Sequence, residues 1–187
     1  MKTALKLFLI FFMLFSFCQA REDLRSYYND IETPAVWKNP TNVKVYIEDD
    51  KIKGYVLERS FKAWDGALRS NLNFRYVTNI DDADISIKFV DKLTGPKAGV
   101  TIPQYYYEDG RAYLHKVKVE IAKAASDGKK FTDVQLNEIT LHEIGHAIGV
   151  LGHSDSPHDI MYPQISTYGN TTLSTKDVDT VNKIYGF

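Results

Sequence analysis

The sequence predicts an α+β fold, and two observations support that class. Periodic segments follow one another along the 187 residues as a strand, a helix, several strands and then two helices. The strand segments are short and alternate apolar with polar residues, as expected of a sheet with one face in a core. The length suits one domain, or two at most. A single cysteine cannot form an internal disulfide, so a core or a bound metal must stabilise the fold.

Strands are expected in four segments where apolar and polar residues alternate or strand-forming residues cluster. They cover residues 43–47, 74–77, 85–89 and 117–121. Residues 95–110 contain glycine, proline and three consecutive tyrosines, which favours a loop. A helix is expected over 51–70, where the apolar stripe consists of Leu57, Phe61, Trp64 and Leu68.

Two further helices are expected near the C-terminal end. The first begins near Thr132, which has capping-box spacing to Gln135, and extends to Gly149. The second begins at Ser174 and ends at Gly186. These elements complete the α+β pattern.

Composition excludes two classes of protein. A 44% share of hydrophobic residues is too high for a disordered chain, and a net charge of -1 lacks the basic surface that nucleic-acid binding requires. We therefore expect a folded protein with no nucleic-acid partner, and we expect it to be a monomer.

Residues 1–20 resemble a secretory signal peptide. Lys2 and Lys6 precede an apolar run over 7–17, which is shorter than the roughly 20 residues that span a bilayer. An uncleaved anchor and a lipoprotein modified at Cys18 are the alternatives. With the signal removed we expect no stable membrane insertion and a secreted, extracellular protein, with the periplasm and cell surface also open. Residues 21–36 are expected to be a leader or short prosegment.

The chemistry is concentrated in the segment that begins at His142. On a helix, His142 and His146 lie about 40° apart around the axis and roughly 6 Å apart along it, so both imidazoles can bind one metal ion. Gly149 can adopt positive φ and turn the chain back, which makes His153 the expected third ligand, with His158 the second candidate. Three histidines that leave one position open are typical of catalytic Zn²⁺.

Glu143 stands beside the two helical histidines and is not needed as a ligand. A carboxylate in that place can act as general base toward a zinc-activated water that attacks a carbonyl. The sequence therefore predicts Glu143 as the catalytic residue of a zinc hydrolase.

These residues resemble the signature of the metzincin metallopeptidases, and within them the matrixin-like group. The match includes His142, Glu143, His146 and Gly149, whereas the third histidine, His153, comes one residue later than in the signature. Residues 159–163 resemble the family's methionine turn, and 173–186 resemble its closing helix.

The resemblance implies a catalytic domain over 37–187, with a twisted mixed sheet, an active-site helix, a Met-turn and a C-terminal helix. It implies a secreted zinc endopeptidase that cleaves proteins or peptides, with the substrate extended along the strand at 117–121. Met161 is expected beneath the metal as support. A wall of the substrate pocket is expected from Pro163, Gln164 and Ile165.

Other metal sites receive weaker indications. Ca²⁺ is possible at two acidic groups, formed by Asp81, Asp82 and Asp84 and by residues 108–110. A second, structural zinc is not expected, because only His115 is available in the corresponding region. Asp23 or Asp30 in the leader are candidates to cap the catalytic metal.

Two other functions remain open from the sequence. The domain could be a catalytically idle, metal-stabilised binding domain, although such a domain has no use for Glu143. It could also be a zinc hydrolase of a non-protein amide.

Overall fold

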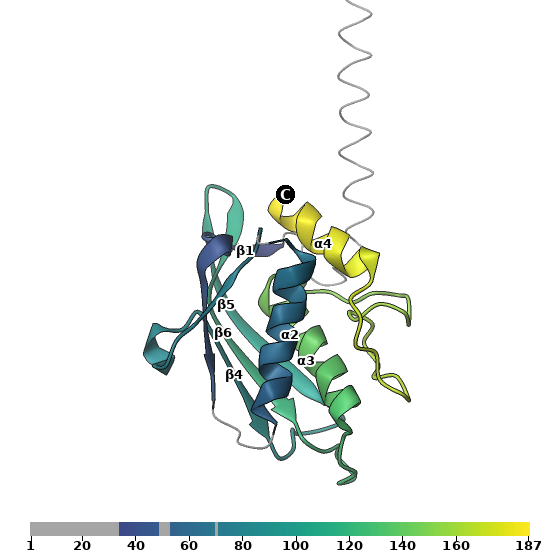
Figure 1. Ribbon diagram of the computed structural model, residues 1–187. Coiled ribbons are helices and arrows are strands. Elements are labelled where there is room, and N and C mark those ends of the chain that lie inside the picture. The colour runs from purple at the N-terminus through teal and green to yellow at the C-terminus, as the bar shows by residue number, and fades with distance from the viewer. Residues whose placement is uncertain (1–33, 49–52, 70) are drawn as a thin grey trace, which may run out of the picture.

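The structure is a computed structural model and describes residues 34–48, 53–69 and 71–187. The expected signal peptide and nearly all of the expected leader lie outside these residues. A six-stranded sheet carries two helices against one face, α2 (Gly54–Ala67) and α3 (Asp133–Ala147), and α4 (Thr175–Tyr185) lies near one end (Figure 1). The predicted α+β class is confirmed.

The sheet is mixed, with one antiparallel pair. Its strands are β1 (Ala35–Trp37), β2 (Val43–Ile47), β3 (Phe74–Tyr76), β4 (Ile85–Val90), β5 (Gly99–Glu108) and β6 (Arg111–Ala122). Their order is β1-β6-β4-β2-β3, all paired in parallel, and β5 pairs antiparallel with β6. Short 3-10 helices occupy Pro40–Asn42 and Ile80–Asp82. All four predicted strands are present.

The prediction of a loop over 95–110 is wrong, because β5 occupies most of that segment. This strand lies at the edge of the sheet and is exposed along most of its length, so its sequence lacks the alternation by which half-buried strands are recognised. An edge strand also tolerates Pro103, which has no N–H to donate. A register shift between Gln104 and Tyr105 interrupts the pattern further.

The expectation that substrate extends along 117–121 is also wrong. These residues belong to β6 and pair with β4 on one edge, while β5 covers the other edge. In the described part of the chain, β5 pairs only with β6, so its other edge is free, and Gly99, Val100 and Thr101 at the start of this strand line the cleft.

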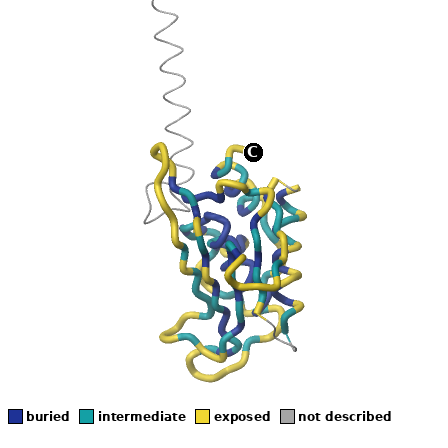
Figure 2. The backbone as a smooth tube through the Cα atoms, turned by 90° about the vertical axis from the view of Figure 1, so that its left-hand side faces the viewer, coloured by how far each residue is buried: buried dark blue, intermediate teal, exposed yellow. Residues whose placement is uncertain are grey.

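The core lies between the sheet and the helices α2 and α3. Its largest fully buried side chains include Trp64, Phe61, Leu57, Ile87, Ile121, Leu136 and Ile144. Figure 2 shows the buried backbone at the centre of the molecule, with exposed residues along the loops and the outer hairpin. The helical stripe predicted for 51–70 faces this core.

The helix boundaries follow the predicted capping signals. Thr132 and Gln135 form a capping box at the start of α3, and Ser174 caps α4 in the same way. Gly186 ends α4 with φ of 79°. No helix within the described ranges is long and apolar enough to span a bilayer.

Candidate metal centre

The structure brings the side chains of His142, His146 and His153 together. The first two project from successive turns of α3, and the third follows the turn after this helix. One ligand atom from each side chain lies within 4.8 Å of the other two. Within the described residues, this is the one group of three or more potential metal-ligating side chains.

Hydrogen bonds orient the two helical imidazoles. His142 Nδ1 lies 2.8 Å from the carbonyl oxygen of Ile160, and His146 Nδ1 lies 2.5 Å from that of Val150. Because a carbonyl only accepts, each Nδ1 carries the hydrogen and each Nε2 keeps its lone pair for a metal. Burial lowers the pKa of His142 to about 4 and that of His146 to about 3, so both are neutral at pH 7. The donor set fits Zn²⁺.

Gly149 makes the return of the chain possible, as the sequence indicated. Its φ is 108°, and a Cβ at this position would lie 2.2 Å from the carbonyl oxygen of Ala35. A side chain is therefore excluded both by backbone conformation and by the close approach of β1. The turn positions the carbonyl of Val150 to orient His146.

Residues from both ends of the described chain hold the last turn of α3. The indole Nε1 of Trp37 donates to the carbonyl of Ala147 at 3.0 Å, and the Tyr185 hydroxyl donates to that of Ile148 at 2.9 Å. These carbonyls have no partner within the helix, so β1 and α4 satisfy the groups that the helix end exposes.

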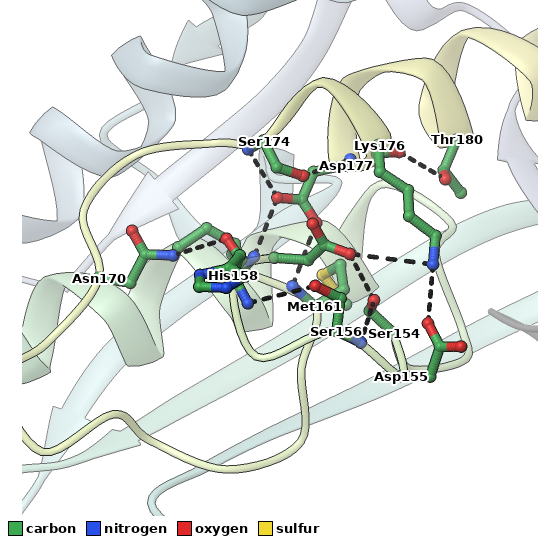
Figure 3. Close-up of polar contacts among 12 residues, drawn as sticks. Ser154, Asp155, Ser156, His158, Met161, Asn170, Ser174, Lys176, Asp177 and Thr180 are labelled. Carbon is green, nitrogen blue, oxygen red and sulfur yellow. Dashed lines mark hydrogen bonds and ion pairs between the residues drawn. The ribbon is translucent and has the colours of Figure 1, made fainter.

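Met161 lies in close contact with α3. The side chain is fully buried, and a Cβ on Gly145 would lie 2.3 Å from its sulfur. Asp177, buried in the first turn of α4, accepts hydrogen bonds from the backbone N–H groups of Ile160, Met161 and Ser174 at 2.8–3.2 Å (Figure 3). One carboxylate therefore fixes the methionine turn to the closing helix.

A second polar group joins the same turn to α4. Ser154 donates to Asp159 at 2.5 Å, and its backbone N–H donates to the carbonyl of Met161. Lys176 extends toward Asp155 with an Nζ to Oδ1 distance of 2.9 Å (Figure 3). The segment that carries His153 is thus tied to both the methionine turn and α4.

Glu143 lies between the histidines and β5. Its carboxylate accepts a 2.6 Å hydrogen bond from the Thr101 hydroxyl, and a Cβ on Gly99 would lie 2.5 Å from it. Burial raises the pKa of Glu143 to about 7, and the bond from Thr101 and the charge of Lys97 oppose this shift. A metal cation held by the histidines would oppose the effect of burial on this pKa and favour the carboxylate.

The histidines and Glu143 open onto a cleft of about 580 Å³. One wall of the cleft consists of β5 and the segment that precedes it. The other wall consists of α3 and the segment that follows the methionine turn. The three residues predicted to form a pocket wall, Pro163, Gln164 and Ile165, line it. Sequence reasoning missed Gly99, Thr101 and Glu138, because the first two lie in the segment assigned to a loop and the third carries no motif.

The remaining histidines and the residues of the two acidic groups considered for Ca²⁺ lie outside the histidine cluster. His158 and His115 are exposed, and the ring of His115 contacts Tyr106. Glu108 pairs with Lys38 at 2.5 Å, and the Asp84 carboxylate accepts a hydrogen bond from the backbone N–H of Lys44. The calcium prediction gains no support from these contacts.

The family model described as matrixin matches residues 37–186. The chain belongs to the matrixin family of peptidases. The match covers β2 to β6, the helix that carries His142 and His146, and the closing helix, and it begins at the last residue of β1.

Similar proteins occur in organisms as different as Glycine max and Sus scrofa. The chain is 30% identical over 147 residues to metalloendoproteinase 1 of Glycine max, covering 74% of this chain and 47% of that protein. It is 40% identical over 137 residues to interstitial collagenase of Sus scrofa, and this match covers 70% of this chain and 27% of that protein. The chain thus spans about a quarter to a half of the length of these relatives.

Among solved structures, the chain is similar to high choriolytic enzyme 1, a hatching enzyme zinc-protease from Oryzias latipes. The identity is 14%, the TM-score is 0.46, and the match covers 81% of this chain and 94% of that one. The family assignment rests on the matrixin match alone.

Proposed function

We propose that the protein is a zinc-dependent endopeptidase in which His142, His146 and His153 hold the ion and Glu143 is the general base. The observation that carries this proposal is the placement of Glu143. Its carboxylate is buried beside the three histidines and is held by Thr101 in a cleft open to a ligand. A zinc ion bound there supplies Lewis-acid chemistry, which polarises a peptide carbonyl and acidifies a water molecule.

Glu143 performs the proton transfers in this proposal. Its carboxylate takes a proton from the attacking water and delivers that proton to the leaving amine. The Thr101 hydroxyl donates to one carboxylate oxygen, which keeps the other available for the proton. Gly99 lets the strand approach so closely that Glu143 has a fixed position.

The edge of β5 supports an extended peptide as substrate. Gly99, Val100 and Thr101 line the cleft from a strand whose outer edge is free among the described residues. A peptide can pair with such an edge through its main chain, and the cleft can receive its side chains. In this proposal the substrate therefore extends along β5 and not along residues 117–121.

The protein is further proposed to be exported and to act as a monomer. Residues 1–20 provide the signal, as the sequence indicates. Extracellular proteins and peptides are therefore the proposed substrates.

The test is cleavage of unfolded casein by purified 21–187, with Glu143→Ala compared at matched zinc content. Cleavage by the parent alone supports both the activity and the role of Glu143. Equal cleavage by the two proteins contradicts that role. Cleavage of a cell-wall amide without cleavage of casein would favour a hydrolase of a different amide, and failure on both substrates after removal of 21–36 would favour an idle binding domain.

A further inference from the structure

The cleft contains an acidic side chain to which the proposed mechanism assigns no role. Glu138 lies on α3, one helical turn before His142, and lines the cleft together with Ile139, Pro163 and Ile165. Its exposed fraction is only 8%. A carboxylate buried among apolar cleft residues requires a partner or costs free energy.

The partners that the chain provides are neutral. The backbone N–H of Ser166 donates to both carboxylate oxygens at 3.1 and 3.3 Å, and its hydroxyl lies 3.3 Å from one of them. No lysine, arginine or histidine in the described part of the chain forms an ion pair with Glu138. A carboxylate has about four acceptor positions, so two donor groups leave it able to accept more.

We propose that Glu138 makes the cleft selective for a cationic side chain, lysine or arginine, at the substrate residue that follows the scissile bond. This inference rests on the proposed peptidase function and on the pocket wall of Pro163, Gln164 and Ile165, which the matrixin resemblance assigns to the side chain beyond the scissile bond. It names the substrate class: peptides with a basic residue directly after the bond that is cleaved.

Selection operates in both directions. A cationic group that enters the cleft completes the hydrogen bonding of Glu138 and compensates its charge in a water-poor place, where charge-assisted bonds are strongest. An apolar side chain would remove the remaining water from the carboxylate without forming a hydrogen bond or an ion pair with it. Ser166 fixes the direction of the carboxylate and so keeps the charge at one place in the cleft.

The experiment compares zinc-loaded parent and Glu138→Gln on matched peptides that carry lysine, arginine, leucine or methionine after the scissile bond. Glutamine keeps the size and one acceptor oxygen for Ser166 but removes the charge. We expect the parent to prefer the basic peptides by about ten- to hundredfold in kcat/KM, and the variant to lose that preference while it still cleaves the apolar peptides. A preference for only one of the two basic residues identifies the cation that fits.

Two control variants separate recognition from structure. Glu58→Gln makes the same charge change at an exposed site on α2 and should leave the preference unchanged. Ser166→Ala keeps the charge and the backbone N–H that donates to both carboxylate oxygens and removes only the hydroxyl contact, so it should weaken the preference much less than Glu138→Gln does. Equal kcat/KM for basic and apolar peptides in the parent, or an unchanged ratio in Glu138→Gln, overturns the proposal.

A binding measurement keeps the inference separate from the proposed activity. In zinc-loaded Glu143→Ala, the same peptides with a fluorescent label are titrated by anisotropy, with and without Glu138→Gln. Tighter binding of the basic peptides that depends on Glu138 supports the inference even if the parent cleaves nothing, a result that would refute the peptidase alone. The inference is refuted if zinc-loaded Glu143→Ala binds all four peptides equally or binds none of them, and if the parent cleaves none of them preferentially.

Discussion

The two walls of the cleft are built in different ways. The wall formed by α3 and residues 150–166 contains the histidines and Met161, and its backbone is fixed by hydrogen bonds to the buried Asp177. The opposite wall is β5, which is largely exposed and has one free edge. In the proposed mechanism, the first wall holds the reacting groups in place, and the second presents main chain to a peptide. Substitutions that break the hydrogen bonds supporting the first wall should therefore affect stability, whereas substitutions on β5 should affect activity.

The largest effect is expected from Asp177→Asn. The new amide would present a donor to backbone N–H groups that now donate to a carboxylate oxygen, so at least one buried hydrogen bond to a charged group is lost. We expect a loss of about 3 kcal/mol in the free energy of unfolding. Urea denaturation measures it.

The matched control is Asp179→Asn, the same change at an exposed position on α4. It should alter stability by no more than about 0.5 kcal/mol. A similar loss in both variants would show that Asp177 acts through helix charge and not through the methionine turn.

Gly99→Ala should have the next largest effect, and on activity. Its Cβ would lie 2.5 Å from the Glu143 carboxylate, so the general base must move. A displacement of this kind is expected to reduce kcat/KM about 10²-fold, with unfolding and bound zinc close to those of the parent. Peptide cleavage, urea denaturation and metal analysis are measured together. Parent-like activity would mean that β5 shifts easily and that this wall does not position Glu143.

Thr101→Val should reduce kcat/KM by about tenfold at neutral pH, because an isosteric side chain removes the hydrogen bond to the base. Burial raises the pKa of Glu143, and the bond from Thr101 opposes that rise. Its loss must therefore raise this pKa, and the activity, which needs the carboxylate, should fall at a higher pH than in the parent. A pH profile of kcat/KM measures the shift. An acid limb at unchanged or lower pH would contradict this role of Thr101.

The smallest effect is expected from Ile102→Thr on the same strand. Ile102 is 51% exposed and is not among the cleft-lining residues. Threonine also favours strands, so the free energy of unfolding and kcat/KM should both remain near the parent values, within about 0.5 kcal/mol for the former. Thermal denaturation and peptide cleavage test this, and a large loss of activity would extend the functional surface of β5 to its other face.

The sequence by itself determined the groups whose relation is local. His142 and His146 lie one helical turn apart by helix geometry, Gly149 is needed where the chain reverses, and the capping box at Thr132 specifies where α3 begins. Short-range rules of this kind depend on the spacing of residues along the chain and on their backbone preferences, and both follow from the amino-acid sequence.

Only the tertiary structure decided which residues surround these groups. The contact of Thr101 with Glu143 joins residues 42 positions apart, and Ser166 contacts Glu138 across 28 positions. The edge position of β5 follows from the pairing of β6 with β4 and β1 on its other edge, which no local pattern encodes. Contacts over such separations arise when the chain packs a common core, so they depend on the whole fold and not on the spacing of any motif.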